Sequence, residues 1–310
     1  MTTTLFTSSG GVLRGNLHGH STHSDGWNSP AEVVRLYREA GYDFTCLSEH
    51  YWSDPRFSAP TIIDATDLDS TDFITIISAE LHCNGKAHDR DGLWHIVANG
   101  LPPDFPMASD RETAPELVAR AVAAGAYVTI AHPEWYCLTD DEARSLAAAG
   151  AHAVEIYNHS SAIESARGGG IATLDLLLHE GYRLHLTATD DSHNGPDDAF
   201  GGWVMAAAES LTAIDIVAAL RAGNFYASSG PDFTDLTLDG TTLHVGTSPV
   251  HRIILAADRH QATFTVGDGL TTASFDLRSL DSDFFRVVAI DAQGRSAWSN
   301  PYWIDGAVCA

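Results

Sequence analysis

The chain has 310 residues, of which 44% are hydrophobic, and its formal net charge is −24. This length suffices for one barrel-sized domain and a smaller one, and no apolar run approaches the roughly 20 residues that span a bilayer. The strong negative charge argues against a broad basic surface for duplex nucleic acid and against a polybasic patch for membranes.

The N-terminal segment, MTTTLFTSSG, has no basic region followed by an apolar stretch. We therefore predict that the protein has no signal peptide and is cytoplasmic.

From residue 13 to about 228, short apolar runs alternate with amphipathic helical patterns. The predicted strands are DFTCLSEH, DFITIISAE, LWHIVANG, AYVTIAHP, AHAVEIYN, YRLHLTATDDSH and GWVMAAAES. They are continuously apolar, as expected for a parallel sheet that is covered on both faces.

Helical patterns lie between several of these strands. The first, SPAEVVRLYREAG, has Ser29 as N-cap, Pro30 at the first helical position and Gly41 at its end. The others are APELVARAVAAG, DDEARSLAAAG, IATLDLLLHEG and TAIDIVAALRAG. Repeated strand–helix units predict an α/β fold, either a (β/α) barrel or a doubly wound open sheet.

The pattern changes after SSGPDF, which spans residues 228–233. Residues 234–310 show no helical period and contain strand-like runs separated by Asp-Gly and Gln-Gly turns. We predict a barrel domain over residues 1–230 and a small all-β, sandwich-like domain over residues 231–310.

Histidine and carboxylate side chains stand at the ends of most predicted strands of the first domain. They are His18, His20, His50, Glu80, His95, His132, Asp190, Asp191 and His193, with Asp25 just beyond the first strand. The C-terminal ends of barrel strands meet at one face, so these residues should converge. Imidazole and carboxylate suit zinc, manganese and iron, and burying so many titratable groups without metal would cost several kcal/mol each. We therefore predict a metal site. The remaining histidines that we interpret as structural or solvent-facing are His23, His152, His179, His185, His251 and His260.

These residues occur in motifs that resemble those of the PHP (polymerase and histidinol phosphatase) family. NLHGHSTHSDG resembles the first motif, LSEH the second, SAE the third, and AHP and DDSH the later ones, all in the family's order over residues 13–228. The tail GRSAWSNPYWI resembles the CehA/McbA-like branch, which includes carbaryl hydrolase. Amidohydrolases also begin with HxH, but they usually add a carboxylated lysine at a strand end, and no predicted strand end here supplies one.

The resemblance implies a distorted, TIM-like (β/α)7 barrel with two or three divalent ions, which would be zinc, manganese or iron. It assigns His18, His20, Glu80 and Asp191 to the first metal. Glu80 would bridge to a second metal held by His95 and His132, and Asp25, His50 and His193 would hold a third. Glu80, Asp191 and His193 would thus be catalytic. The sequence departs from the family motifs at two residues close to predicted ligands. Asn16 and Glu49 stand where the family usually has Asp.

Clustered divalent cations lower the pKa of a shared water, so we expect a metal-bridging hydroxide that attacks phosphorus or a carbonyl carbon. The leading prediction is a phosphoesterase for a small-molecule or nucleotide phosphate mono- or diester. The alternatives are a carbamate or carboxylester hydrolase of the CehA/McbA type and a catalytically silent metal-binding accessory domain. The sequence predicts no oligomeric state.

Substrate contacts are predicted from polar loops near the strand ends. Lys86, with His88 and Arg90, follows Glu80, while His159 and Arg167 follow the strand AHAVEIYN. These residues are candidates to hold a phosphate or to face the metals, and a solvated loop residue is the alternative for each.

Overall fold

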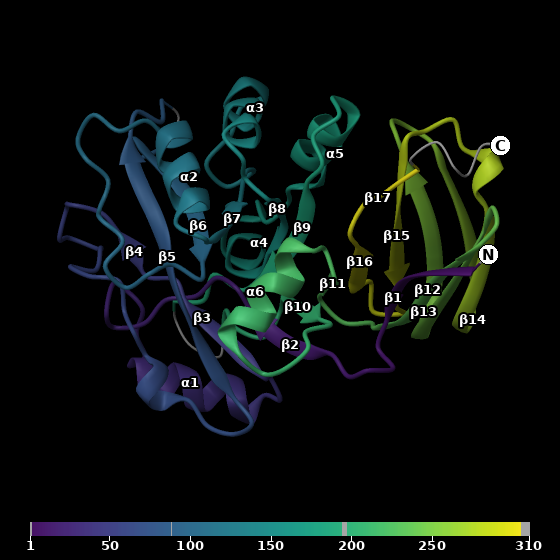
Figure 1. The fold of residues 1–310 in the computed structure, drawn as a ribbon, viewed down its shortest axis with the longest axis horizontal. Helices are drawn as coiled ribbons and strands as arrows, with labels where there is room; N and C mark the ends of the chain where they lie inside the picture. The colour runs from purple at the N-terminus through teal and green to yellow at the C-terminus, as the bar shows by residue number, and fades with distance from the viewer. Residues whose placement is uncertain (1, 88, 194–196, 305–310) are drawn as a thin grey trace.

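The computed structural model describes residues 2–87, 89–193 and 197–304 (Figure 1). Over these residues the chain is a mixed α/β protein with six α-helices and a 17-stranded sheet. The predicted α/β organisation is confirmed.

The helices begin where the sequence provides caps. The Ser29 side chain accepts a hydrogen bond from Glu32 N at the start of the first helix, and capping boxes begin the second and third helices at Thr113 and Thr139. Their bounds are α1 Pro30–Glu39, α2 Ala114–Ala123, α3 Asp140–Ala148, α4 His159–Ser165, α5 Ile171–His179 and α6 Ala213–Arg221. Within the described parts of the chain, no helix is long and apolar enough to cross a bilayer.

Helix α4 was not predicted, because its seven residues, HSSAIES, carry little apolar periodicity. It is defined locally instead. The Asn158 side chain accepts a hydrogen bond from Ser161 N at its start, and Ala166, with φ +57°, ends it.

Among the described residues, eleven strands lie before the C-terminal all-β part of the chain. Their bounds are β1 Thr2–Thr7, β2 Leu13–Asn16, β3 Phe44–Leu47, β4 His50–Tyr51, β5 Ile74–Asn84, β6 Leu93–Asn99, β7 Tyr127–Ile130, β8 Ala153–Asn158, β9 His185–Thr189, β10 Trp203–Ala206 and β11 Phe225–Ser228. The pairings β2–β3, β3–β5, β7–β8 and β8–β9 are parallel, as predicted.

Strand β6 corrects the expectation of a purely parallel sheet. It pairs antiparallel with both β5 and β7. Only residues 85–92 connect β5 to β6, and a parallel pairing needs a crossover of a dozen or more residues. The direction of β6 also matters for the site, because its first half, rather than its end, lies beside the C-terminal half of β5.

A closed barrel is not observed among the described residues. Strand β2 pairs with β3 on one edge and antiparallel with β10 on the other, so neither edge is free to pair along its length with β9. The contact between β2 and β9 lies beyond the strands, where Gly19 and Ser192 form an isolated bridge and Asp191 N donates to His18 O at 2.9 Å. The sheet is therefore open at this seam, and the segments that directly follow β2 and β9 are brought together there.

The C-terminal part is built from strands, as predicted, and lies at one end of the molecule (Figure 1). Its strands are β12 Phe233–Asp239, β13 Thr242–Ala257, β14 Ala262–Asp276, β15 Phe284–Ile290, β16 Ser296–Ser299 and β17 Tyr302–Trp303. Strand β1 pairs antiparallel with β12, and Phe6 packs in the same apolar cluster as Leu236 and Ile253. Residues 2–7 therefore pack with the C-terminal sheet, although the predicted boundary assigns them to the first domain. The domain boundaries themselves stay a prediction.

Candidate metal centre

The nine predicted metal ligands converge on one region, together with His82, which was not predicted. The structure brings them together from the segments that follow β2, β7 and β9, from β4 and β5, and from the first half of β6. These ten residues are called the metal cluster below: His18, His20, Asp25, His50, Glu80, His82, His95, His132, Asp191 and His193.

Four overlapping groups within the metal cluster could each hold a metal ion, because their ligand atoms lie within 4.8 Å of one another. They are His18, His20, Glu80 and Asp191; then Glu80, His95 and His132; then His20, Asp25, His50 and His193; and finally His50, Glu80 and His82. The first two match the predicted groups. The third contains the predicted Asp25, His50 and His193 and adds His20.

Glu80 is the centre of this arrangement and is fully buried. One carboxylate oxygen, Oε1, lies 2.7 Å from His95 Nδ1 and 3.2 Å from His132 Nε2. The other, Oε2, lies 2.6 Å from His50 Nδ1 and 3.5 Å from His18 Nε2. A single carboxylate thus faces histidines of three groups, which is the geometry required of a bridging ligand.

Two further carboxylates complete the cluster. Asp191 Oδ1 lies 2.9 Å from His20 Nε2 and 3.1 Å from His18 Nε2. Asp25 Oδ1 lies 3.5 Å from His50 Nε2 and 3.6 Å from His193 Nε2. Asp191 therefore stands on the buried side and Asp25 on the open side of the cluster.

His82 could have been found from its spacing. It lies two residues after Glu80 on β5, so both side chains point to the same face of the sheet. Its Nδ1 is 2.9 Å from Trp94 O and donates to it, which leaves Nε2 as an acceptor 2.8 Å from His50 Nδ1. This tautomer is the one that could bind a metal through Nε2.

Glu155, in the middle of β8, supports the cluster from behind and was also missed. Its Oε1 accepts from His18 Nδ1 at 2.7 Å, and its Oε2 accepts from His132 N at 2.7 Å and from Asn158 Nδ2 at 3.1 Å. A carboxylate bonded to Nδ1 fixes the tautomer of a ligand histidine and directs Nε2 towards the metal. In the sequence, the sign of this role is that Glu155 is a single acidic residue within the apolar run AHAVEIYN.

The two departures from the PHP motifs have structural roles. Glu49 accepts from Ser21 N at 3.1 Å and from Ser24 N at 3.2 Å, and so shapes the loop that carries Asp25. Asn16 donates from Nδ2 to His18 O at 2.7 Å and accepts at Oδ1 from Asp190 N at 3.1 Å. Both residues position the backbone next to ligands.

Asp190, a candidate strand-end residue, points away from the metal cluster. Its carboxylate accepts from the Tyr37 hydroxyl at 2.7 Å and from the backbone N–H groups of Phe200, Gly201 and Gly202 at 2.8–2.9 Å. Its neighbour Asp191 adopts φ +55°, a left-handed conformation that non-glycine residues seldom take. This turn sends successive carboxylates in different directions, one to the scaffold and one to the cluster.

The pKa shifts of Glu80 and its neighbouring histidines indicate how the cluster responds to positive charge. Burial alone would raise the pKa of Glu80, but the surrounding histidines, His50 and His95 first, hold it well below its usual range. Burial opposes the charged form of His50, yet the Glu80 carboxylate raises the pKa of His50 to about 9. For His20, burial and the neighbouring His193 and His50 lower the pKa. The site thus keeps its carboxylates ionised and attracts cations.

The donor set fits a metal by a second criterion. His18 Nε2 is a buried side-chain atom without a hydrogen-bond partner in the described structure. Such atoms normally have a partner in folded proteins. Because His18 Nδ1 donates to Glu155, Nε2 presents a lone pair 3.1 Å from Asp191 Oδ1, and a divalent cation between the two would satisfy both.

The cluster opens into a pocket of about 460 Å³. Beside Asp25, His50, His95, His132, Asp191 and His193, it is lined by Phe57, Asp89, Arg90, Asp91, Leu93, Trp135, Ser160, Ser161 and Glu164. Its wall therefore combines metal-ligand candidates with an arginine, three further carboxylates, two hydroxyl groups and two aromatic rings.

The predicted substrate residues lie elsewhere, and their roles stay predictions. Lys86 is buried, with Nζ 3.2 Å from Glu142 Oε2, and His159 lines a different cavity. Arg167 is exposed after α4 and is not among the described residues that line the metal pocket. His88 lies outside the described residues. Arg90, which lies on the same loop as Lys86, does line the pocket.

The histidines interpreted as structural or solvent-facing are absent from the described metal-capable groups. His23 Nε2 lies 3.0 Å from Thr61 O, and His152 Nδ1 accepts from Val128 N at 3.0 Å. His179 pairs with Asp258 at 3.0 Å. These contacts agree with the interpretation from the sequence.

Comparison with known proteins bears on the fold. The sequence matches no protein-family model and no curated protein. The structure is similar to a two-domain protein of Bacteroides vulgatus that contains a predicted PHP-like metal-dependent phosphoesterase, with a TM-score of 0.55, 15% identity and 96% of each chain covered.

Two further solved structures are more distant. A Bifidobacterium adolescentis protein assigned as a metal-dependent phosphoesterase has a TM-score of 0.43 and 16% identity, covering 58% of this chain and 87% of its own. An amidohydrolase from Chromobacterium violaceum has a TM-score of 0.45 and 15% identity, covering 59% and 89%. These TM-scores are too low to support an argument. The likeness over 96% of each chain shows that this chain shares the fold of that PHP-like protein, as its motifs predicted.

Proposed function

We propose that this protein is a metal-dependent phosphoesterase that hydrolyses a small-molecule or nucleotide phosphate mono- or diester. The observation that carries this proposal is the set of overlapping histidine–carboxylate groups that share Glu80 and His20 and open into one pocket. Such a donor set suits two or three zinc, manganese or iron ions. Bound there, divalent ions would activate water and neutralise charge on the phosphoryl oxygens.

The chain's own residues prepare this chemistry. Glu80 faces histidines of three groups and would keep neighbouring ions close together. Glu155 holds the His18 ring through Nδ1, and Asn158 Nδ2 donates to Asp191 Oδ2 at 3.1 Å, so both ligands are oriented before any ion binds. His193 Nδ1 donates to Asp191 O at 2.8 Å, which turns its Nε2 towards the open side of the cluster.

The pocket wall fits a phosphoester with an apolar leaving group. Arg90 lines the mouth with a side chain that is 92% exposed, and its Nε lies 3.8 Å from Asp91 Oδ2. Ser160 and Ser161 offer hydroxyl groups from the first turn of α4, while Phe57 and Trp135 supply apolar walls. Arginine is well suited to bind phosphoryl oxygens in pairs.

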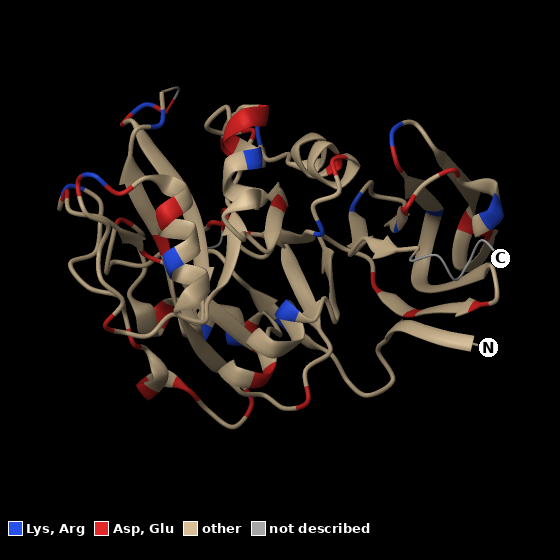
Figure 2. Ribbon diagram, turned by 45° about the horizontal axis from the view of Figure 1, so that its top comes forward, with Lys and Arg blue, Asp and Glu red and all other residues tan. Residues whose placement is uncertain are grey.

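The charge distribution supports a small substrate. Acidic residues are spread over helices and loops, and lysine and arginine do not gather on one face in the view of Figure 2. With a net charge of −24, the protein would repel a long polyanion, whose binding depends on many basic contacts. A small anion needs only the metal pocket and Arg90.

The test is a hydrolysis screen of chelated protein to which manganese or zinc is returned. The substrates are p-nitrophenyl phosphate, bis(p-nitrophenyl) phosphate, p-nitrophenyl acetate and 1-naphthyl N-methylcarbamate. The proposal predicts metal-dependent turnover of a phosphate ester that is lost in Glu80→Gln and kept in the surface control Glu39→Gln. Turnover of the carbamate or acetate alone would favour the ester-hydrolase alternative. Bound metal without turnover of any substrate would favour the accessory-domain alternative.

A further inference from the structure

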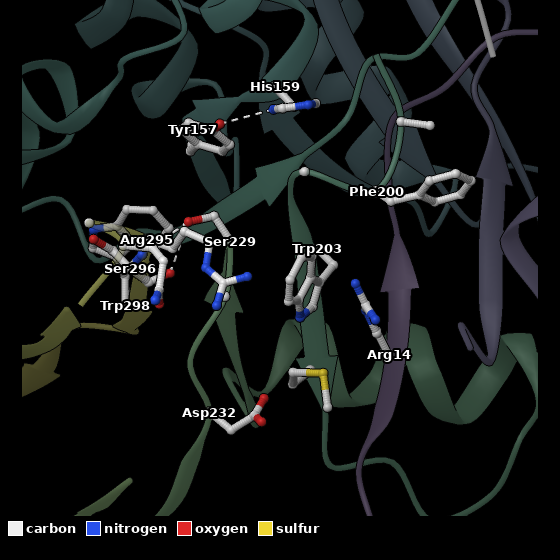
Figure 3. Close-up of a pocket in the computed structure, with 16 residues that line it drawn as sticks. Arg14, Tyr157, His159, Phe200, Trp203, Ser229, Asp232, Arg295, Ser296 and Trp298 are labelled. Carbon is white, nitrogen blue, oxygen red and sulfur yellow. Dashed lines mark hydrogen bonds between the residues drawn. The ribbon is translucent and has the colours of Figure 1, made fainter. Parts of the chain in front are cut away.

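A second cavity lies where the first part of the chain meets the C-terminal strands. Its volume is about 890 Å³, within the range of small-molecule sites, and such sites are frequent between domains. It shares no lining residue with the pocket at the metal cluster. Figure 3 shows its walls, to which β2, β8 and β10 contribute together with residues 229–232 and 293–298.

Arg14 contributes a positive charge to this cavity that the protein does not neutralise directly. Its guanidinium lies between two aromatic rings, 3.8 Å from the centre of the Trp203 ring and 4.1 Å from that of Tyr42. Within the described residues no ion pair involves Arg14; its Nη2 donates to the Tyr42 hydroxyl at 3.3 Å, and its buried Nε has no hydrogen-bond partner. The aromatic rings and the Tyr42 hydroxyl hold the cation in place, and among the described residues Nη1 is left to donate to a ligand.

A second cation borders the cavity from the C-terminal part. Arg295 pairs with Asp291 through Nε at 2.7 Å, and it lies so close to Gly230 that a Cβ there would be 2.7 Å from its Nε. In Figure 3, Trp203 stands between Arg14 on one side and Arg295 on the other. Asp232 is the carboxylate that lines the cavity among the described residues, and it already accepts from the Tyr226 hydroxyl at 3.0 Å.

The aromatic walls provide the apolar part of a binding site. Trp298 stacks on Tyr157 with 6.0 Å between ring centres and 25° between planes, and both line the cavity with Trp203 and Phe200. Trp203 is only 8% exposed, and its Nε1 is a buried donor without a hydrogen-bond partner. Buried indole N–H groups usually find an acceptor. Cations, aromatic faces and unused donors therefore occur together in one cavity.

We propose that this junction cavity binds a small organic anion that carries a planar ring. The ring would pack against the tryptophan and tyrosine faces, and the anionic group, either carboxylate or phosphoryl, would accept from Arg14, with Arg295 adding positive charge from the other side of Trp203. This inference does not depend on the hydrolytic function, because the two pockets are separate.

The experiment is isothermal titration of the full-length protein with three anions and one neutral ligand. Phenylphosphonate and benzoate present a ring with a phosphoryl-like or a carboxylate group, methylphosphonate lacks the ring, and benzyl alcohol lacks the charge. The expected result is saturable binding of phenylphosphonate or benzoate, at least about tenfold tighter than binding of methylphosphonate or benzyl alcohol. Which of the two ring anions binds better identifies the anionic group.

Variants assign the binding to the cavity. Arg14→Gln and Arg295→Gln remove its cations, and Trp203→Phe removes the indole donor but keeps an aromatic ring. The matched control is Arg90→Gln, which removes an arginine from the metal pocket instead. We expect Arg14→Gln to weaken binding about tenfold and Arg90→Gln to leave it unchanged. Arg295 is largely exposed, so its variant serves as the test if Arg14→Gln fails to fold.

Two results would overturn the proposal. One is the absence of saturable binding by either ring anion. The other is binding that Arg90→Gln weakens while Arg14→Gln and Arg295→Gln do not, which would place the anion at the metal cluster.

Discussion

Replacing Glu155 by glutamine tests whether this buried carboxylate sets the tautomers of the cluster. Its two oxygens accept four hydrogen bonds, from His18 Nδ1, Thr189 Oγ1, His132 N and Asn158 Nδ2, at 2.7–3.1 Å. Glutamine has one accepting oxygen, and its amide group must replace the other. Either orientation of the amide therefore damages the site.

If the amide NH2 faces His18, the ring must accept at Nδ1 and carry its proton on Nε2, the atom that points into the cluster. If it faces His132 instead, two donors meet at the backbone N–H. Loss of such a support lowers metal affinity by about 10- to 100-fold, or about 1.4–2.8 kcal/mol. A buried donor left unpaired also costs about 1–3 kcal/mol of folding stability.

The assay is a zinc competition titration against a fluorescent chelator, together with urea unfolding of the chelated protein. Glu39→Gln is the control, because Glu39 forms an exposed pair with Arg35 on α1 and such pairs contribute at most about 1 kcal/mol. Wild-type zinc affinity in a stably folded Glu155→Gln protein would refute the reasoning.

Three further predictions concern the site and the scaffold. Glu80→Gln should lower bound metal and turnover together, as measured by elemental analysis and initial rates; full activity at unchanged metal content would rule out the bridging role. Arg90→Gln should raise KM for a phosphate ester with little change in kcat, because the side chain lies at the mouth, and a fall in kcat alone would speak against that position. Burial lowers the pKa of His152 and His185 to about 4 from 6.5, with the Arg221 charge adding to the effect on His152. The unfolded chain then binds more protons between these values, so stability is complete above about pH 6.5 and falls towards pH 4, by on the order of 2 kcal/mol for each histidine. Urea unfolding across this range should show the loss, and His152→Gln should reduce it by about half because His185 still titrates; a wild-type curve that is already flat would contradict the assignment.

The convergence of the ligands could be predicted because strand ends in an α/β fold meet at one edge. His18, His132 and Asp191 each follow an apolar run, and their chemistry is visible in one dimension. The strand-end pattern places His95 in the correct region, but it does not include the direction of β6. This residue lies in the first half of its strand, and only the antiparallel direction of β6 brings it beside Glu80.

Other features depend on contacts that the sequence does not show. Glu155 lies inside a strand rather than at its end, and its role becomes visible only when its neighbours across the sheet are known. Lys86 is close to Glu80 in sequence, yet a half-buried partner on α3, Glu142, holds its ammonium group. The pairing of residues 2–7 with β12 joins segments more than 200 positions apart, which no local pattern predicts.

The central claim is that the metal cluster binds divalent cations that hydrolysis requires. Elemental analysis of the purified protein, combined with phosphate-ester turnover after chelation and after return of each metal, tests it most directly. The account predicts two or three equivalents of zinc, manganese or iron, loss of turnover on chelation and recovery with at least one of these metals. Less than one equivalent of metal after incubation with each ion, or turnover that survives complete chelation, would contradict it.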